Sequence, residues 1–378
     1  MHKFSQALQK SRKRPIIVWL DDDTLLIDHK RISLHKFREH LHFHINTLRT
    51  FLAEKVLLGI NLEEIGVNID FEKLGDEGDF TTVDYSPLLG GLDGNPDSNK
   101  LLKALVDQGK LVSFRDGEIA WNFQRAQEWE ADIHEAVCKA YSLSHICEGA
   151  PGRVTEEDKM LVSNTFSSHR HTVTAPGLNT LATCSNYWKG AQVSGRFKEI
   201  LRVFPRAISD FIFILVRLIR PLELLFLIQH VVHEKARQDT IKAYSASLWT
   251  SFGQALTASA MYRSFANLMA LPGNDGKRTF DFAFNIRLYH QFTAAVQRRH
   301  LPGPSRYTQK IANSLTSIGD LQAGRSEGTS HQHYAPEKST VNMEPGFIAH
   351  YVAYSCDWHK FLGLETESTG MLKDTEKR

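Results

Sequence analysis

The chain has 378 residues, of which 42% are hydrophobic and 23% are charged. This balance is typical of a compact globular protein and excludes a disordered or fibrous chain. The length is sufficient for one large domain or two smaller ones. Lysine and arginine number 45 against 43 aspartate and glutamate, so any nucleic-acid surface must be a local patch.

The cysteine pattern and the apolar segments bear on the compartment. Four cysteines lie far apart, which argues against a disulfide framework and fits a reducing, intracellular compartment. The first apolar run, residues 16–20, is too short for a secretory signal. Residues 211–232 are rich in Phe, Ile and Leu but contain Arg217, Arg220 and Pro221. A central arginine costs about 2.5–3.5 kcal/mol in a membrane, so we expect two buried helices that meet near Pro221, and no membrane partner.

In the first half of the chain the apolar periodicity predicts helices. Residues 10–15, Lys-Ser-Arg-Lys-Arg-Pro, form a basic cluster that could be a nuclear import signal, a phosphate contact or a solvated tail. Residues 33–58 predict an amphipathic helix with Ser33 as N-cap, Gly59 as stop and a histidine-rich outer face. Residues 75–100 predict a long loop near a domain boundary. A short helix over residues 101–112 follows, and then a longer one over 121–147, whose apolar side would carry Trp129, Ile133, Ala136, Val137 and Tyr141.

The second half begins with a β-type pattern. Two runs rich in Thr, Val, Leu and Tyr within residues 168–189 flank Ala175-Pro176-Gly177, which predicts a β-hairpin. Helices are expected again to about Ala270, followed by a turn over residues 271–279 and a helix over 280–299. A short helix near residues 311–317 and an aromatic segment over 347–361 complete the chain. The sequence therefore predicts a mainly α protein with a small antiparallel hairpin packed on helices.

Four short motifs occur in a fixed order. Residues 152–156 read Gly-Arg-Val-Thr-Glu, and Lys189 lies at the end of the second strand of the predicted hairpin. Residues 256–263, Leu-Thr-Ala-Ser-Ala-Met-Tyr-Arg, open a predicted helix, and residues 321–326, Leu-Gln-Ala-Gly-Arg-Ser, precede Tyr334. Each motif alone is common, but four in this order, with a hairpin between the first and the third, are more specific.

In this order the motifs resemble the boxes of the tyrosine recombinases. Residues 187–225 also resemble the recombinase-like regions of fungal Crypton-type mobile elements and those beside fungal telomere-linked RecQ-like helicases. The resemblance spans roughly residues 100–362 and implies the fold of the DNA breaking-rejoining enzymes. We therefore expect a helical, core-binding-like domain over residues 1–122, a catalytic domain over 123–362, and a disordered tail over 363–378.

The resemblance also implies catalytic roles for five residues. Arg153 and Arg263 would hold the scissile phosphate through bidentate hydrogen bonds. Lys189 would protonate the leaving 5′ oxygen, and Tyr334 would attack phosphorus and become covalently linked. Arg325 stands where the family usually has a histidine, at the expected spacing from Tyr334 (334 − 325 = 9).

Two departures from the family pattern put catalysis in doubt. Ala260 replaces a histidine that usually precedes the second arginine. Arg325 keeps positive charge, but an arginine does not exchange protons near neutral pH. We therefore expect activity to be reduced or absent, which leaves two interpretations. One is a DNA strand transferase, and the other is a non-catalytic DNA-binding or protein-interaction remnant of a mobile element.

The resemblance implies partners and a location as well. Double-stranded DNA would be held between the two domains, mainly through its phosphates, so that binding weakens with salt. A homo-oligomer on DNA and an association with a RecQ-like helicase are compatible with this interpretation. No cofactor and no metal is expected, and the location would be nuclear.

Each candidate also has a structural interpretation. Arg153 could form a surface ion pair with Glu156 or Glu157, and Arg263 could cover core residues Phe265 and Met269 with its apolar stem. Lys189 could be an ordinary strand-end lysine.

Other patterns compete with the assigned site. Tyr351 and Tyr354 are alternatives to Tyr334 as the nucleophile, or all three are packing residues. The pairs His331/His333 and Cys356/His359 lack the second pair that a zinc site needs. Residues 273–279 resemble a phosphate-binding loop but lack its spacing and a preceding strand, so a turn is expected there.

Overall fold

The computed structural model describes residues 16–74, 76, 80–90, 95–185, 200–301 and 345–364. The helices are α2 (Leu34–Phe51), α3 (Pro96–Gln108), α4 (Phe123–Cys147), α5 (Val154–Glu157), α7 (Arg206–Ile212), α8 (Arg220–His230), α9 (Glu234–Ala246), α10 (Ala258–Ala270), α11 (Ile286–His300) and α13 (Pro345–Leu362). Two π-helical segments, η1 (Leu52–Val56) and η3 (Phe213–Ile219), and one 3-10 turn, η2 (Glu72–Leu74), complete the helical part.

The described strands form four small antiparallel sheets. Two have three strands, in the orders β1-β2-β3 and β6-β7-β8, and two are hairpins, β4-β5 and β9-β10. Their bounds are β1 Ile17–Trp19, β2 Thr24–Ile27, β3 Lys30–Ser33, β4 Val112–Arg115, β5 Glu118–Trp121, β6 Thr172–Thr174, β7 Leu181–Ser185, β8 Ile200–Val203, β9 Thr250–Ser251 and β10 Gln254–Ala255. The prediction of a mainly α protein with small antiparallel β elements is confirmed.

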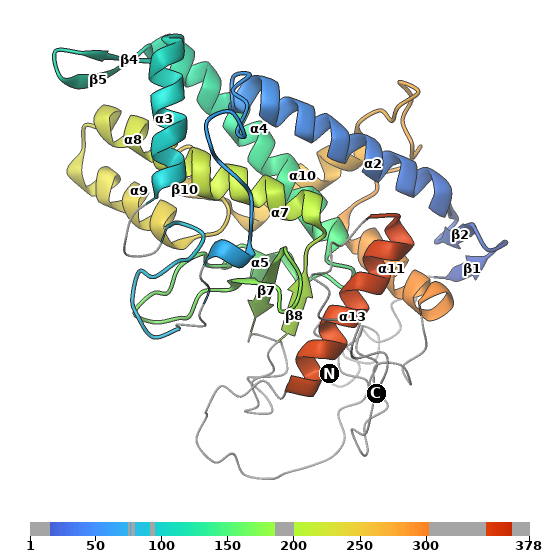
Figure 1. Cartoon of the computed structure of the whole chain (residues 1–378). Helices are drawn as coiled ribbons and strands as arrows, with labels where there is room; N and C mark the ends of the chain where they lie inside the picture. The colour runs from blue at the N-terminus through green and yellow to red at the C-terminus, as the bar shows by residue number, and fades with distance from the viewer. Residues whose placement is uncertain are drawn as a thin grey trace, which may run out of the picture.

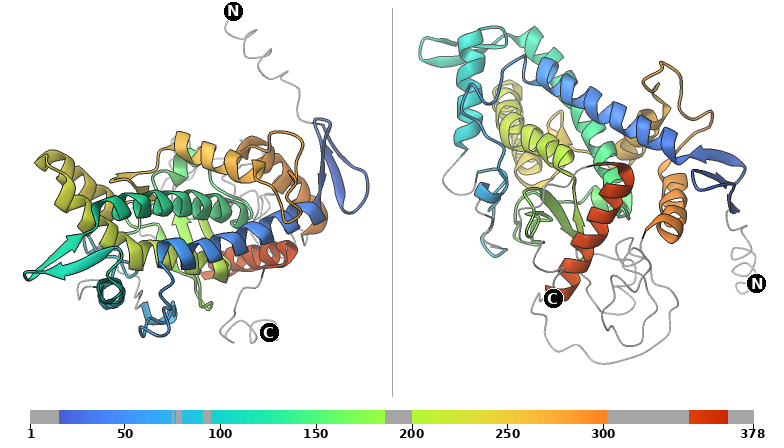
Figure 2. Two further views of the ribbon diagram at one scale, coloured as in Figure 1. Left: turned by 90° about the horizontal axis from the view of Figure 1, so that it is seen from above. Right: turned by 45° about the vertical axis from the view of Figure 1, so that its right-hand side comes forward.

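Helix α4 lies at the centre of the molecule and contacts α2, α7, α10 and α13 (Figure 1). Figure 2 shows α2 beside α4, with the β1–β3 sheet at one end of the molecule and the β4–β5 hairpin at the other. Sheet β6-β7-β8 lies below α4 in Figure 1, and α13 packs against β8. This arrangement places the short helix α5, which follows α4, next to both the sheet and α10.

Helix α2 begins and ends as the sequence predicts. The Ser33 side chain accepts a hydrogen bond from the backbone N–H of Lys36, which satisfies one of the free donors in the first helical turn. The helix continues through η1 and stops at Leu58 and Gly59, both at positive φ. Glycine adopts this backbone conformation without steric cost.

The prediction that the histidines of α2 lie on its outer face is wrong for two of them. His40 and His44 are 2% and 4% exposed, and their rings lie 4.3 Å apart. His40 Nδ1 lies 2.9 Å from Thr279 Oγ1, so the turn after α10 covers a face that looks polar in the sequence. Burial lowers the pKa of both rings to about 4, and both are uncharged at neutral pH.

The segment before α4 differs from the prediction. Helix α3 begins at Pro96, inside the predicted loop, because the Asn95 side chain caps it and proline suits the first turn. The helix stops at Gly109 (φ +68°), and β4 begins at Val112. The β4–β5 hairpin was not predicted, although its turn is Asp116-Gly117, both at positive φ, and Asp-Gly is typical of two-residue hairpin turns.

Two helical segments meet near Pro221, as predicted: η3 ends at Ile219 and α8 begins at Arg220, with no gap in the helical run from Arg206 to His230. At the end of η3 the N–H of Arg220 bonds to the carbonyl of Leu215, five residues back. This wider turn displaces the carbonyl that a proline ring would otherwise meet. Within the described residues, no helix is both long and apolar enough to cross a membrane.

The hairpin predicted around Ala175-Pro176-Gly177 is confirmed as β6 and β7, to which a third strand, β8, is added. The turn predicted over residues 271–279 is also present, since Gly273 N–H bonds to the carbonyl of Lys277. The predicted helix over residues 280–299 begins later, at Ile286, because the Asn285 side chain caps it.

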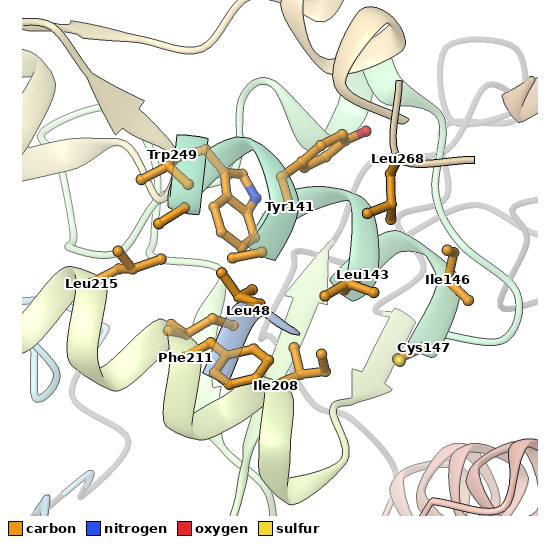
Figure 3. Close-up of a cluster of buried hydrophobic side chains, with 14 of the residues drawn as sticks. Leu48, Tyr141, Leu143, Ile146, Cys147, Ile208, Phe211, Leu215, Trp249 and Leu268 are labelled. Atoms are coloured by element: carbon orange, nitrogen blue, oxygen red, sulfur yellow. The ribbon is translucent and has the colours of Figure 1, made fainter. Parts of the chain in front are cut away.

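Two hydrophobic clusters hold these elements together. The larger cluster joins residues from β2 to α13 and contains side chains from both sides of the predicted boundary at residues 122 and 123. Figure 3 shows part of it, where Leu48 of α2, Leu143 of α4 and Phe211 of α7 gather around one centre. The smaller cluster packs β8 and its neighbours against Tyr351, Val352 and Tyr354 of α13. The predicted domain division itself stays a prediction.

Candidate functional site

The first candidate residue, Arg153, lies at the start of α5. Its backbone is extended (φ −79°, ψ 145°), and its N–H donates to the Glu156 side chain at 3.3 Å, which fixes the start of the short helix. The Arg153 side chain is 46% exposed, and its Nε lies 3.9 Å from Glu156 Oε1. At this distance and exposure the ion pair is weak, so most of the guanidinium donors face solvent.

The second candidate, Arg263, lies on the outer face of α10. Met261 and Phe265, two residues before and after it, are buried, and successive residues turn by about 100° around a helix. Arg263 therefore points away from Phe265 and does not cover it, which removes the structural interpretation based on its apolar stem. Among the described residues it has no hydrogen-bond or ion-pair partner.

Helices α5 and α10 pack against each other, so the two arginines are carried by adjacent elements. His145 of α4 contacts both helices. Its ring lies 5.5 Å from Phe265 of α10, and its Nδ1 lies 2.8 Å from Glu157 Oε2 of α5. No contact joins Arg153 to Arg263 in the described part of the chain.

A buried polar network supports α5 from below. Glu157 is 2% exposed and accepts a hydrogen bond from the Tyr141 hydroxyl at 2.8 Å. Burial raises the pKa of Glu157 to about 8 and lowers that of His145 to about 4. At neutral pH both groups are uncharged, and the contact between them is a neutral hydrogen bond.

A buried arginine links this network to the sheet. Arg202 of β8 is 1% exposed; its Nε donates to the carbonyl of Ala150 at 3.0 Å and its Nη1 to Ser185 Oγ at 3.1 Å. Its Nε also lies 3.8 Å from Glu148 Oε2. Burial raises the pKa of Glu148 to about 8, although Arg202 opposes the shift. Arg202 thus fixes the segment before Arg153 to the ends of β7 and β8.

Lys189 lies outside the described residues, on the connection over 186–199. Both described ends of that connection are placed by the contacts of Arg202. Ser185 is the last residue of β7, and Ile200 opens β8 two residues before Arg202. The connection that carries Lys189 therefore leaves and rejoins the fold beside the Arg153 segment.

Arg325 and Tyr334 also lie outside the described residues, as do residues 10–15, the expected helix at 311–317, and His331 and His333. The segment that contains both site residues begins after Leu301 and ends before α13. Leu301 and Ile348 of α13 both pack on the smaller hydrophobic cluster. The two ends of this segment are thus held at the same sheet that anchors the Lys189 connection.

The competing tyrosines are packing residues. Tyr351 and Tyr354 are 3% and 2% exposed within the smaller cluster. Burial raises the pKa of Tyr351 to about 12, which is the wrong direction for a nucleophile. Neither hydroxyl is accessible to a DNA strand in this structure.

Of the two pairs that could be taken for metal ligands, only Cys356 and His359 lie within the described residues, on α13. His359 is fully buried, and its Nε2 donates to the carbonyl of Cys147 at 3.2 Å. No group of three or more His, Cys, Asp or Glu side chains in the described ranges could hold a metal ion.

A second buried network positions α10. Arg220 donates to the carbonyls of Tyr244, Ser247 and Leu248. The Tyr244 hydroxyl donates to Glu223 and accepts from the N–H of Gly253. These bonds hold the β9–β10 hairpin directly before α10, the helix that carries Arg263.

The two buried networks were missed by reasoning from the sequence. The available signal was a charged residue within an apolar strand, as in Ile-Leu-Arg202-Val, and the Arg220-Pro-Leu-Glu223 motif within an apolar helix. Charged side chains are rarely buried unless they are paired. Comparison with protein-family models, with curated proteins and with solved structures gives no match.

Proposed function

We propose that this chain binds double-stranded DNA through a tyrosine-recombinase-like site in which Arg153 and Arg263 contact a phosphate. The observation that carries the proposal is the contrast between two groups of arginines. Arg202 and Arg220 are buried and donate to protein carbonyls. Arg153 and Arg263 are exposed on adjacent elements and leave most of their donors free, as a phosphate-binding pair requires.

The remaining candidates fit the same place. Lys189 lies on a connection whose ends flank the Arg153 segment, and Tyr334 and Arg325 lie on a segment whose ends pack on the neighbouring cluster. Both segments start and finish at one sheet, next to the segment that carries Arg153. This shared anchoring supports the recombinase interpretation.

The chemistry of such a site needs no metal. The Tyr334 oxygen forms a bond to phosphorus while the bond from phosphorus to the 5′ oxygen breaks. Lys189 gives its proton to that leaving oxygen, and the phenolic proton passes to solvent. The arginines hold the negative charge that grows on the other phosphate oxygens.

A second function, DNA binding without strand cleavage, is favoured by the sequence at two positions. Arg325 cannot exchange a proton as the usual histidine does, and Ala260 offers no polar group. Both functions place the protein on DNA, in the nucleus, and they share the two arginines. They differ only in whether Tyr334 forms a covalent link.

A nicked suicide duplex separates the two functions. A strand transferase forms a denaturant-resistant protein–DNA adduct that disappears in Tyr334→Phe. The matched control is Tyr262→Phe, since Tyr262 is 49% exposed beside Arg263 and should not affect the adduct. Salt-sensitive binding without an adduct identifies the non-catalytic form.

Phosphate binding is tested by the salt dependence of the affinity. Each lost phosphate contact should reduce the slope of log affinity against log salt by about 0.9, so we expect this for Arg153→Ala and for Arg263→Ala. Arg115→Ala is the control, because Arg115 is exposed on the distant β4–β5 hairpin. Unchanged slopes in both site variants would refute the proposed site.

A further inference from the structure

The hairpin turn before α10 carries an aromatic side chain in a conformation that suits glycine. Phe252 and Gly253 connect β9 to β10, and both have positive φ, at +49° and +77°. Two-residue turns of this kind favour asparagine or aspartate before the glycine, whereas a bulky residue at positive φ is strained. Strained residues cluster at binding sites and active sites, so the Phe252 side chain is a candidate for a binding role.

Packing does not account for the Phe252 side chain. Phe252 is 46% exposed and belongs to neither of the two hydrophobic clusters. The turn is fixed through its backbone instead, since the Gly253 N–H donates to the Tyr244 hydroxyl at 3.1 Å. A smaller residue at position 252 would therefore leave the turn in place.

The Phe252 ring lies against His134 of α4, which is held in one orientation. The ring centres are 4.8 Å apart and the ring planes are inclined by 35°. His134 Nδ1 lies 2.6 Å from Ser251 Oγ, and its Nε2 lies 3.7 Å from Cys138 Sγ. Burial lowers the pKa of His134, so its ring is uncharged at neutral pH. The Phe252 ring is thus supported by a fixed, neutral ring and keeps an open surface.

The charge of Arg263 acts one helical turn along α4 from this ring pair. Burial raises the pKa of the Cys138 thiol, whereas a hydrogen bond with Ser264 and the positive charge of Arg263 act in the opposite direction. Cys138 and His134 are four residues apart on one face of α4, about 6 Å along the helix. The Arg263 charge and the exposed Phe252 ring therefore lie about one helical turn apart along α4, a spacing that one nucleotide can span.

The neighbouring acidic residue is already paired. Glu135 also acts on the Cys138 thiol, but its carboxylate pairs with Lys139 at 2.6 Å. Arg263 forms no ion pair in the described part of the chain, so its charge can neutralise a phosphate.

We propose that Phe252 stacks against an unpaired base of DNA whose neighbouring phosphate is held by Arg263. An aromatic ring can stack against any of the four bases, because every base has a π-face. A base inside a duplex is already stacked on both faces, so the ring selects a base that is unpaired, as at a gap or in an opened duplex. This role rests on the proposed DNA-binding function and narrows its substrate class to DNA with unpaired bases beside the bound phosphate.

Binding of single-stranded DNA, followed by fluorescence anisotropy, tests the stacking. Phe252→Asn should weaken the affinity for an oligothymidylate of about twelve nucleotides on the order of ten-fold, which is the loss expected for one base–aromatic stack. The slope of log affinity against log salt should stay the same, because no charge is removed. Arg263→Ala should instead reduce that slope by about 0.7, the value for one phosphate of a single strand.

A matched oligonucleotide in which abasic sites replace the bases separates stacking from phosphate binding. It keeps every phosphate, so the parent chain and Phe252→Asn should bind it with equal affinity. An equal loss of affinity for both oligonucleotides would overturn the stacking role, as would an unchanged affinity of Phe252→Asn for oligothymidylate.

Thermal unfolding shows whether weaker binding comes from a loss of structure. Asparagine suits positive φ, so Phe252→Asn should unfold at the same temperature as the parent chain or higher. Phe252→Trp keeps an aromatic face and should retain the affinity. A lowered melting temperature in Phe252→Asn, together with weak binding by Phe252→Trp, would assign Phe252 a packing role and contradict the proposal.

Phe123→Ala is the matched control. Phe123 is 50% exposed, and its ring lies 5.2 Å from that of His230. Its neighbour Arg125 pairs with Glu128 at 2.8 Å, so this ring pair has no free arginine beside it. The variant should bind both oligonucleotides as the parent chain does.

Failure of the stacking role differs from failure of the proposed function. If the parent chain binds duplex DNA and Arg263→Ala reduces the salt slope, but Phe252→Asn binds oligothymidylate like the parent, only the stacking role is wrong. If neither duplex nor single-stranded DNA binds, both are wrong.

Discussion

Replacing Glu157 by glutamine tests whether the network beneath α5 is neutral. Glu157 accepts from Tyr141 and lies 2.8 Å from His145 Nδ1. Burial raises the pKa of Glu157 to about 8 from its usual 4.5. The folded protein therefore holds a proton that the unfolded chain loses above about pH 4.5. Glutamine copies the protonated form, since its oxygen can accept from Tyr141 while its nitrogen donates to His145.

The sign and size of the effect follow from proton linkage. Because the pKa of Glu157 is raised in the folded state, its contribution to the free energy of unfolding is fully present at low pH. This contribution is lost as the pH rises toward 8. One proton bound only by the folded state changes the free energy of unfolding by about 1.4 kcal/mol per pH unit. Between about pH 5.5 and pH 7.5, Glu157→Gln should therefore gain about 3 kcal/mol relative to the parent chain.

Urea unfolding followed by circular dichroism at a series of pH values measures this difference. Glu135→Gln is the matched control for the loss of one negative charge, because Glu135 lies on the same helix α4 with 52% of its side chain exposed. Parallel pH profiles for Glu157→Gln and the parent chain would show that Glu157 is ionised in the folded protein. The neutral description of the network would then be refuted.

Three further variants test the packing. Gly149→Ala should cost about 2–5 kcal/mol in thermal unfolding, because a Cβ there would lie 2.8 Å from Trp358 Cγ and the backbone has φ +78°; an unchanged melting temperature would contradict this contact. Ser33→Ala should lower the urea-unfolding free energy by about 1 kcal/mol through loss of the α2 cap, and no loss would show that the cap is dispensable. Tyr244→Phe removes the hydroxyl that donates to Glu223 and accepts from the Gly253 N–H, and should cost about 1–3 kcal/mol, measured in the same way; a neutral result would mean that the β9–β10 hairpin is held by other contacts.

The parts of the fold that could be predicted from the sequence are those encoded locally. Helix α2 follows from its periodicity and the Ser33 cap, and the β6–β7 hairpin follows from its turn. Strand β1 has only three residues and β8 four, so neither shows a periodicity that distinguishes it from a loop.

Long-range packing explains the errors. Nothing near His40 in the sequence indicates that Thr279 and its turn will cover it, so its ring was assigned to solvent. At the candidate site, the sequence motifs identify Arg153 and Arg263. They do not predict the buried hydrogen-bond networks that position the helices carrying these two residues. Arg202 joins Ala150 to Ser185 across more than thirty residues of sequence, and only folding reveals that pairing.

The larger hydrophobic cluster limits the domain movements that this protein can make when it binds a partner. Its members come from both sides of the boundary between residues 122 and 123, with Leu48 of α2 packed beside Leu143 of α4 and Phe211 of α7. A hinge motion that separated the two predicted domains would expose these buried side chains to water, at a cost of roughly 25 cal/mol for each Å² of apolar surface. If the protein binds DNA as proposed, the duplex would therefore lie on a rigid face, and adaptation to its shape would come from peripheral hairpins such as β4–β5.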